Sequence, residues 1–416
     1  MSKDHKILPK LRFPEFESDG EFREKSLGYF CDYWNGSGNE SGVTEDGQYL
    51  LISLNSIDIE GNLKSDMKRV PSTDNSLKKG DLVMVLSDVA HGNFLGLSAI
   101  IPDDNYVLNQ RMAGLGIKDF SEIDPKYLRL FINGNQKYFK RQGQGSSQQN
   151  LSKGSVIDFP VLVPTRLIEQ QKIASCLSSL DELIAAHKDK LDALKDHKKG
   201  LLQNLFPQEG ESVPKVRFPE FEDDGEWVEN ELGKICDVRD GTHDSPKYVS
   251  DGYPLITSKN LLENGAMDFE NVSYLTQEDY DKINQRSKVD VGDILFGMIG
   301  TIGNPVIVKR DGFAIKNVAL IKTKGLLEQE YLIQLLKSNY IDIQFQKANA
   351  GGILKFIALG MIRKLIIPTP KKEEQQKIAS CLSAVDELIT AQQEKIEQLQ
   401  QHKKGLMQGL FPKIES

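Results

Sequence analysis

Two stretches of this chain place apolar residues at alternating steps of four and three, which is the heptad pattern of a helix that packs along another helix. The first stretch runs from Glu169 to Pro207 and the second from Glu374 to Pro412. At about 1.5 Å rise per residue, each predicts a helix roughly 55 to 60 Å long, far longer than an average globular helix. The predicted helix–helix seam consists of Ile173, Leu177, Leu180, Ile184, His187, Leu191 and Leu194 in the first stretch and Ile378, Leu382, Val385, Ile389, Gln392, Ile396 and Leu399 in the second.

The two stretches are copies of one element, because about two-thirds of their aligned positions are identical at an offset of 205 residues, the distance from Glu169 to Glu374. The same offset relates the segment 9–32 to the segment 214–237, in which F-P-E-F is followed by an acidic turn. The chain therefore has two halves that begin and end alike. Between the matched ends lie two blocks, 33–166 and 238–371, that resemble each other only weakly.

The repeat also predicts how the two helices pack. If a pseudo-two-fold axis relates the halves, the helices run antiparallel. The two ends of the chain then lie where a second connection, equivalent to the one that joins the first half to the second, would be. Parallel packing would need a connection that runs back along a whole helix, which short connections disfavour. His187 and Gln392 are the matched polar positions nearest the helix centres, and in an antiparallel pair they would face each other and fix the register. The alternative is that both are exposed at the edge of the seam.

Each block alternates short β-rich runs with Gly, Asn and Asp turns, as 49–57, 81–87 and 95–101 show in the first block. The second block contains YPLITS, DILFGMIG, NPVIVK and VALIKT, and a Gly-Asp turn occurs in both blocks, so we expect a shared fold. Shorter helices are predicted around 125–141 and 328–347. The expected fold class is α+β, with two pseudo-symmetric globular domains and two long antiparallel helices that form a coiled coil. The predicted segments are 1–165, 166–207, 208–370 and 371–416.

Composition supports a soluble protein with two or three domains. The chain has 416 residues, of which 39% are hydrophobic. It has no run of about 18 apolar residues and no signal-peptide pattern at its start, so we expect a cytoplasmic location. The four cysteines form two pairs related by the same offset and lack C-x-x-C spacing, which favours buried thiols over zinc or redox chemistry. A formal net charge of -8 argues against coating nucleic acid by bulk charge, although local basic patches remain compatible with it.

The motifs of several enzyme classes are missing from the sequence. It contains no P-loop, no Asn/Asp-Pro-Pro-aromatic methyltransferase segment and no H-E-x-x-H metal spacing. His197 and His402 recur in H-K-K-G near the helix ends, where cations favour the negative end of the helix dipole. The loop from Asp240 to Tyr248 contains Asp, Thr and His, yet no partner nucleophile or second base lies nearby, so a turn or a ligand contact is favoured over catalysis. We expect no catalytic residues, no bound metal and no cofactor held by this chain.

The segment 126–153 combines several cations, and no acidic residue, with a loop rich in amides and hydroxyls. Cations that hold phosphates beside amides that read base edges are typical of a DNA contact. The alternative is a solvated basic helix followed by a polar linker. The second half has a basic, Gly-rich counterpart at the same place, 345–356, and this recurrence favours function. The candidate residues are Lys137, Lys140, Arg141, Gln144, Ser146, Ser147, Gln148, Gln149 and Lys153, with Lys347, Asn349 and Lys355 in the counterpart.

Two divergent blocks, each followed by a strand, Pro, E-Q-Q-K-I and a helix ending in K-K-G-L-x-Q-x-L-F, resemble the DNA specificity subunit of type I restriction-modification systems. The resemblance covers essentially the whole chain. It implies two target recognition domains that each read half of a split target in double-stranded DNA, and helices that set the spacer and dock two methyltransferase subunits. It also implies that restriction/translocase subunits join the complex and that S-adenosylmethionine, ATP and Mg are used by partner subunits. The DNA-binding set is completed by Asn109, Gln110, Arg111, Thr242, His243, Lys259, Asn260, Lys316 and Asn317.

Two other classes of function compete with DNA recognition. A coiled-coil scaffold whose globular ends bind proteins would show no DNA protection, even with methyltransferase subunits present. An enzyme would show turnover by the isolated chain that is lost when Asp240 or His243 is replaced.

Overall fold

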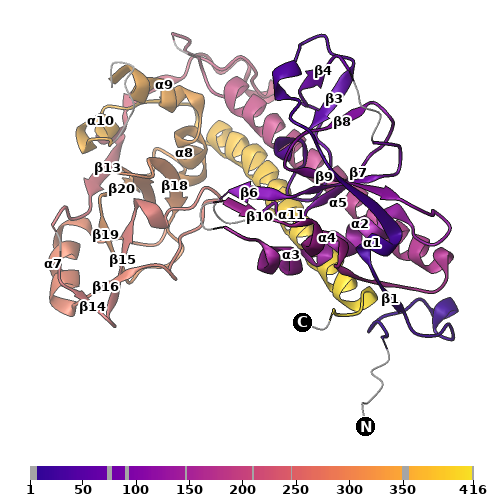
Figure 1. Ribbon diagram of the computed structural model, residues 1–416. Helices are drawn as coiled ribbons and strands as arrows, with labels where there is room; N and C mark the ends of the chain where they lie inside the picture. Colours follow the sequence, from indigo (N-terminus) through magenta and orange to yellow (C-terminus); the bar gives the residue numbers. More distant parts are fainter. Residues whose placement is uncertain are drawn as a thin grey trace. The chain divides into compact units, whose positions relative to one another are not determined.

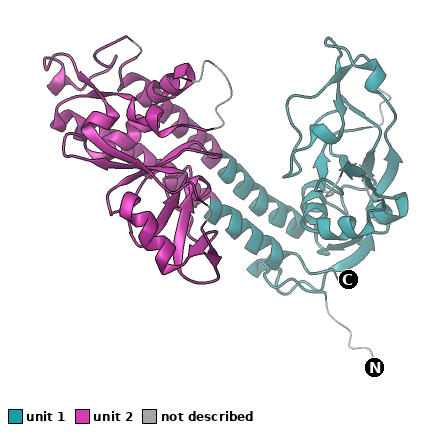
Figure 2. Ribbon diagram, turned by 90° about the vertical axis from the view of Figure 1, so that its left-hand side faces the viewer, with its two compact units in different colours: residues 1–186, 397–416 teal, residues 187–396 magenta. Residues whose placement is uncertain are grey.

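The chain forms two compact units in a computed structural model that describes residues 7–72, 77–89, 93–145, 148–208, 210–244, 246–348 and 356–414. Unit 1 comprises residues 1–186 and 397–416, and unit 2 comprises residues 187–396. Figure 2 shows them in different colours, and each unit contains a part of both long helices. Each unit therefore combines one globular block with the start of the long helix that follows this block and with the end of the other long helix.

The long helices are α5 (Leu167–Asn204) and α11 (Lys372–Leu410), which Figure 1 shows in magenta and yellow. Every residue of the predicted seam is buried or half-buried. In unit 1, Asp181 from the first half of α5 pairs with Lys403 from the last turns of α11. In unit 2, Lys198 Nζ from the second half of α5 lies 2.6 Å from Asp386 Oδ1 in the first half of α11. The helices therefore run antiparallel, as predicted, and the two ion pairs are equivalent under the 205-residue repeat.

His187 and Gln392 face each other, as the antiparallel register requires. Gln392 Nε2 lies 2.6 Å from His187 Nδ1 and donates a 2.8 Å hydrogen bond to the His187 carbonyl oxygen. Gln392 is 7% exposed, so this amide is withdrawn from water at the seam. A buried polar pair at a single seam level penalises shifted registers, in which the amide would lose its partners.

Replacing Gln392 with alanine is expected to lower the free energy of unfolding by about 1–2 kcal/mol, because a buried hydrogen-bonded amide is lost and His187 loses its partner. The matched control is Gln393→Ala, which removes an exposed glutamine from the same helix. Urea unfolding of the full chain measures both variants. Equal effects of the two substitutions would contradict a register-fixing role.

Unit 1 is built on a four-stranded antiparallel sheet of order β2-β9-β5-β7 and a three-stranded sheet of order β4-β3-β8, in which β3 and β8 are parallel. Its strands are β1 (Arg23–Ser26), β2 (Cys31–Asn35), β3 (Tyr49–Ile52), β4 (Arg69–Val70), β5 (Leu82–Val85), β6 (Ser87–Val89), β7 (Ser98–Ile100), β8 (Tyr106–Leu108), β9 (Met112–Ile117), β10 (Gln148–Asn150) and β11 (Pro160–Val163). Its short helices are α1 (Leu27–Phe30), α2 (Pro125–Gly134), α3 (Gln136–Gln142) and α4 (Lys153–Ile157).

Unit 2 repeats this plan with sheets of order β13-β20-β17-β18 and β14-β16-β15-β19, the latter with a parallel β15–β19 pair. Its strands are β12 (Val228–Glu231), β13 (Cys236–Asp240), β14 (Tyr248–Val249), β15 (Tyr253–Thr257), β16 (Ser273–Leu275), β17 (Ile294–Gly297), β18 (Gly303–Ile307), β19 (Ala314–Lys316), β20 (Val318–Thr323) and β21 (Ile366–Thr369). Its short helices are α6 (Leu232–Ile235), α7 (Gln277–Ser287), α8 (Gln329–Leu336), α9 (Asn339–Ala348) and α10 (Leu359–Arg363). The two blocks therefore share a fold, as the Gly-Asp turns predict.

Several elements differ in extent from their sequence predictions. The helix expected around 125–141 breaks at Asn135, whose side chain donates to the Phe131 carbonyl, and continues as α3. The helix expected around 328–347 is likewise two helices, α8 and α9. Part of the amide-rich loop pairs with β6 as the short strand β10. Helix α7 was not predicted, although Thr276 caps it by accepting from the Asp279 N–H.

The matched ends of each half form a structural latch at the start of each long helix. Arg12 makes a bidentate pair with Glu169, which is fully buried, at 2.8 Å for both contacts. Arg217 and Glu374 repeat this pair in unit 2 at 2.7 and 2.8 Å. The hydrogen bond to Glu169 raises the pKa of Arg12.

The segment before each latch closes the far end of the other helix. Leu11 N–H donates to the Gly409 carbonyl at 2.8 Å in unit 1, and Val216 N–H donates to the Asn204 carbonyl at 2.9 Å in unit 2. The rings of Phe411 and Phe206 then enter the two cores, against Tyr127 and Tyr331 respectively. The N-terminal segment thus takes in unit 1 the place that the inter-half linker takes in unit 2, as the pseudo-two-fold arrangement predicts.

Candidate nucleic-acid interface

Each unit presents one polar turn, called its tip below, where the chain passes from one sheet to the other between equivalent strands. In unit 1 the tip joins β8 to β9 through Asn109, Gln110 and Arg111, and in unit 2 it joins β19 to β20 at Asn317. Arg111 has φ 68° and Asn317 has φ 55°, in the left-handed region that non-glycine residues rarely adopt. Asparagine enters this region more readily than arginine does, and residues held in sparsely populated backbone regions cluster at functional sites.

A second loop packs against each tip. Ser37 forms a parallel bridge with Asn109, and Thr242 forms the equivalent bridge with Lys316. The glycine before each bridge permits this approach. A Cβ at Gly36 would collide with the Asn109 carbonyl oxygen, and a Cβ at Gly241 with the Ile315 carbonyl oxygen. The predicted residues Asn109, Thr242, Lys316 and Asn317 are therefore brought together, in pairs, at corresponding places in the two units.

Unit 1 has a cavity of about 430 Å³ beside its tip. Asn109, Gln110, Arg111 and Gln148 line it, so the structure gathers residues from two separate predicted segments. Gln148 arrives there because β10 pairs with β6, where its side chain donates to Ser87 Oγ. A cavity lined by amides, hydroxyls and one guanidinium offers donors and acceptors of the kind that read base edges.

Two acidic residues of the cavity lining orient Asn109 and the nearby backbone. Asn109 is 2% exposed; its Oδ1 accepts from the Asn39 N–H at 3.1 Å, and its Nδ2 donates to Glu40 Oε1 at 3.3 Å. Asp88, also in the lining, accepts from the Val89 and Phe94 backbone N–H groups. Asn109 therefore supports the tip from below, and Gln110 and Arg111 are the members of the tip with free access to a ligand.

The predicted cations of unit 1 lie apart from this cavity lining. Lys137, Lys140 and Arg141 are on α3, where Lys140 Nζ is 3.4 Å from Asn93 Oδ1. Lys153 begins α4 and lies over the Tyr33 ring at 5.7 Å. Gln144 pairs with Asn150, and Gln149 sits opposite Asp88 in the β10–β6 ladder. These cations therefore do not line the cavity.

The remaining predicted residues of unit 2 have mixed surroundings. Asn260 is 4% exposed and its amide is satisfied inside the chain, since it accepts from Thr257 and donates to the Asp268 and Asn271 carbonyls. We therefore do not carry Asn260 into the proposed interface. Lys259, beside it, is exposed, and Lys347 lies in the last turn of α9. Ser146, Ser147, Asn349 and Lys355 lie outside the described residues.

The Asp240 loop of unit 2 forms a chain of polar contacts that reaches the tip of this unit. His243 Nε2 lies 2.9 Å from Asp240 Oδ2, and His243 Nδ1 lies 2.8 Å from Asn317 Oδ1. The other oxygen of Asp240 pairs with Arg286 of α7. Asp240 is 5% exposed, whereas the side chains of Arg286 and His243 are 63% and 55% exposed. Arg286 was missed from the sequence because its helix was not predicted.

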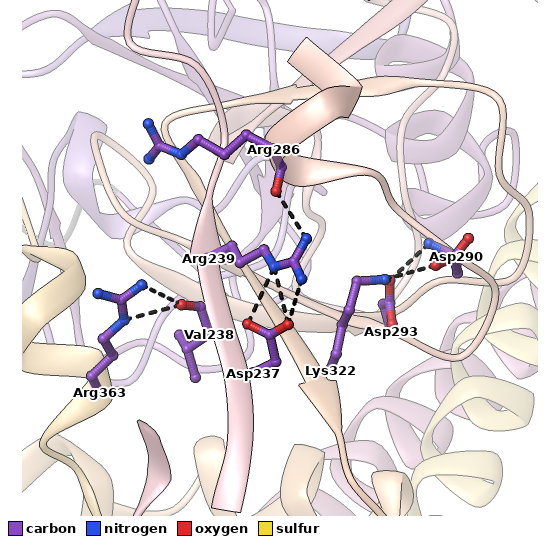
Figure 3. A network of polar contacts seen from close by, with 8 residues as sticks. All are labelled: Asp237, Val238, Arg239, Arg286, Asp290, Asp293, Lys322 and Arg363. Carbon is purple, nitrogen blue, oxygen red and sulfur yellow. Dashed lines mark hydrogen bonds and ion pairs between the residues drawn. The ribbon is translucent and has the colours of Figure 1, made fainter. Parts of the chain in front are cut away.

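Figure 3 shows the polar network that supports this region from strand β13. Arg239 binds the Asp237 carboxylate and donates at 3.0 Å to the carbonyl oxygen of Arg286, which lies in the last turn of α7. Hydrogen bonds from Arg239 lower the pKa of Asp237. Because the last carbonyls of a helix lack intrahelical partners, the Arg239 guanidinium satisfies one of them and fixes the end of α7.

The same network ties down the turn that follows α7. Lys322 of β20 contacts Asp290 Oδ2 at 2.9 Å and Asp293 Oδ2 at 2.5 Å. Burial acts to lower the pKa of Lys322, but the hydrogen bonds to Asp293 and Asp290 outweigh it and the pKa is raised. Arg363 donates to the Val238 carbonyl on the outer edge of β13 at 2.7 and 3.0 Å. The strand that carries Asp240 is therefore held on both sides.

In the described part of the chain, no group of three or more His, Cys, Asp or Glu side chains is arranged to hold a metal ion. None of the helices within the described ranges is long and apolar enough to cross a membrane.

Comparison with known proteins gives consistent matches. A family model for the type I restriction modification DNA specificity domain matches residues 64–196 and 224–401. The chain is 23% identical to the type I restriction enzyme MjaVIII specificity subunit of Methanocaldococcus jannaschii, over 98% of this chain and 95% of that protein. It is 28% identical to a putative type I restriction enzyme MjaX specificity subunit of the same organism, over 70% of this chain and 68% of that protein.

Solved structures show the same fold. The crystal structure of the S subunit of a type I restriction-modification system from M. genitalium matches with a TM-score of 0.62 at 14% identity, covering 98% of this chain and 100% of that one. A chain from a structural study of complex assembly and conformational transition in the type I R-M system matches with a TM-score of 0.60 at 16% identity, covering 94% and 97%.

Proposed function

This chain belongs to the type I restriction modification DNA specificity family, and from that premise we propose that it is the subunit that selects the DNA sequence of a type I restriction-modification complex. Each unit reads one half of a bipartite target in double-stranded DNA. The single observation that carries this proposal is the recurrence of a polar tip with one left-handed residue, Asn109 to Arg111 in unit 1 and Lys316 to Asn317 in unit 2, between equivalent strands of two otherwise divergent blocks.

The chemistry of the two sites supports different readings by the two units. Unit 1 presents Gln110, Arg111 and Gln148, which offer amide and guanidinium groups to adenine and guanine edges. Unit 2 presents the amide of Asn317, next to the cation Lys316 in the sequence. Exposed cations such as Lys137, Arg141 and Lys259 supply phosphate contacts, which position the protein without specifying a sequence. We further propose that the number of residues in α5 and α11 determines the number of unread base pairs.

The partners proposed for this chain are two methyltransferase subunits, with restriction/translocase subunits joined through the complex. Leu183 on α5 and its repeat equivalent Leu388 on α11 are 43% and 56% exposed. Single exposed leucines do not mark an interface by themselves, but their recurrence at matched positions of the repeat gives two copies of one partner the same apolar contact. S-adenosylmethionine, ATP and Mg are proposed to act in those partner subunits, in the cytoplasm, and this chain is proposed to be non-catalytic.

Methylation mapping tests the proposal. Cells that express this chain with its methyltransferase subunits are compared with cells that express a chimaera in which residues 33–166 come from a relative. A bipartite methylated motif that changes in one half only is the expected result. A motif that is unchanged, or methylation that does not depend on this chain, would refute DNA selection and favour a protein-binding scaffold.

A further inference from the structure

We propose that Arg286 is a sequence-reading residue of unit 2 that binds a guanine edge in the major groove, and that Asp240 is the buried positioning residue that aims it. This inference rests on the proposed function and specifies the base chemistry of one of its two sites. It assigns a reading role to helix α7, which has no counterpart among the residues predicted from the sequence to bind DNA.

The buried carboxylate of Asp240 contacts two exposed side chains. One oxygen of Asp240 pairs with Arg286 Nη2, and the other lies 2.9 Å from His243 Nε2. The Asp240 side chain is 8% exposed, but that of Arg286 is 63% exposed. An exposed arginine ordinarily samples many rotamers and loses that freedom on binding. A buried anchor removes much of this cost before the ligand arrives.

Arg286 keeps its hydrogen-bond donors available. Its contact with Asp240 is an ion pair made through Nη2, and Asp240 Oδ1 has no hydrogen-bond partner among the described residues. Neither Nη1 nor Nε of Arg286 has a hydrogen-bond partner there either. A planar guanidinium with a free edge matches the O6 and N7 acceptors of guanine, which is the commonest specific contact in the major groove. A lysine could not replace it, because an ammonium group lacks the second donor in that fixed plane.

The backbone at the end of α7 is also held in place by side chains of neighbouring strands. The carbonyl of Arg286 accepts from Arg239 at 3.0 Å, and Lys322 fixes the following turn through Asp290 and Asp293 (Figure 3). Both the main chain and the side chain of Arg286 are therefore held by β13, through adjacent residues of that strand. Reading residues need this kind of support, because small displacements cost much of a bidentate contact.

Arg286 lies in polar surroundings of mixed charge. It lines a cavity of about 350 Å³ together with Thr242, Lys247 and Lys282, and with the acidic residues Asp244 and Asp279. Because the Asp240 carboxylate offsets the charge of Arg286, the two lysines and two carboxylates of the lining leave it close to neutral. His243 uses one ring nitrogen for Asp240 and the other for Asn317. It therefore links Asp240, the partner of Arg286, to the tip, and both ring nitrogens are already used by these contacts.

Unit 1 carries a different arrangement at the equivalent strand position. Trp34 of β2 pairs with Gly114, as Arg239 of β13 pairs with Leu320. The Trp34 ring covers Gly114, so no guanidinium supports a helix end there. The connection before β5 is also shorter, from Val70 to Leu82, than the connection from Leu275 to Ile294 that contains α7. An arginine at a helix end, supported in this way by the strand beneath it, is therefore found in unit 2 and not among the described residues of unit 1.

The test uses the complete complex of this chain with its methyltransferase subunits and a duplex that contains its mapped methylation target. In the half read by unit 2, each guanine is replaced in turn by 7-deazaguanine, which lacks the N7 acceptor. For the natural chain we expect one such replacement to weaken binding about 10- to 100-fold. Arg286→Ala is expected to weaken binding to the unmodified duplex by a similar factor and to lose the response to 7-deazaguanine.

Two further variants separate reading from folding. Arg286→Lys keeps the charge and is expected to behave like Arg286→Ala in its indifference to 7-deazaguanine. Asp240→Asn is expected to retain partial sensitivity, because an amide oxygen still accepts one hydrogen bond, while Asp240→Ala loses it. The control is Lys282→Ala, on the same helix and cavity, which is expected to weaken binding to both duplexes equally.

The outcomes distinguish this inference from the proposed function. If the methylated motif depends on this chain but no guanine in the unit 2 half couples to Arg286, the inference is overturned and the proposed function stands. If Arg286→Ala weakens modified and unmodified duplexes equally, Arg286 is a phosphate contact. If methylation does not depend on this chain, the proposed function itself fails.

Discussion

Replacing Glu169 with alanine is expected to lower the free energy of unfolding by about 3–5 kcal/mol, the usual cost of removing one partner from a buried ion pair. Glu169 is fully buried and binds two nitrogens of Arg12, whose side chain is 9% exposed. Without the carboxylate, the Arg12 charge stays largely withdrawn from water. The guanidinium then keeps its contacts with the Asp19 and Gly20 carbonyls and with the Phe22 ring, none of which carries a negative charge.

Chemical denaturation of the full chain measures this loss, with the start of α5 followed by hydrogen exchange. The matched control is Lys172→Ala, which breaks the Lys172–Glu15 pair on the same helix turn. Both members of that pair are nearly half exposed, and such pairs contribute about 0–1 kcal/mol. If the two variants lose equal stability, the buried latch does not hold the N-terminal segment in place.

The latch explains part of the repeat. Gln170 and Gln375, the residues after the latch glutamates, are also buried and bond to equivalent backbone groups: Gln170 accepts from the Asp124 N–H and Gln375 from the Glu328 N–H, each at 2.9 Å. The E-Q pair therefore joins each long helix to the short helix of its own block. These residues recur because both blocks need the same joint, which is a structural requirement rather than a DNA contact.

The sequence predicted the elements whose signal is long and periodic. The seams of α5 and α11, their antiparallel direction and the facing of His187 and Gln392 follow from a repeat that spans whole helices. The shared fold of the blocks was predicted from the Gly-Asp turn, and Gly80 and Gly292 do adopt φ 91° and 94° there. Signals that extend over many residues, or that need a left-handed backbone, survive without any knowledge of tertiary contacts.

The contents of the sites were harder to predict, because they depend on contacts between distant segments. Gln148 reaches the unit 1 cavity only through its strand pairing with β6, which three residues cannot signal. Asn260 has the composition of a reading residue but serves inside a turn. Arg286 belongs to a polar helix whose only strong sequence signal is the Thr276–Asp279 cap.

Replacing Arg111 with alanine is expected to relax base preference at one position in the half of the target read by unit 1, by about 1–3 kcal/mol, and to leave the other half unchanged. Alanine occupies the left-handed conformation no more easily than arginine does, so backbone strain at φ 68° is nearly constant between the two. The change therefore reports the loss of the guanidinium. Competition binding to a set of single-base variants of the mapped target measures the preference.

The contrasting variant is Lys137→Ala, on the exposed face of α3 in the same unit. A phosphate contact carries no sequence information, so its loss is expected to weaken binding to every duplex by a similar factor and to lower the slope of log affinity against log salt by about one. If Arg111→Ala instead behaves like Lys137→Ala, with uniform weakening and a lower salt slope, then Arg111 of the tip contacts the phosphate backbone of the DNA. In that case the reading groups of unit 1 must be sought among Gln110 and Gln148.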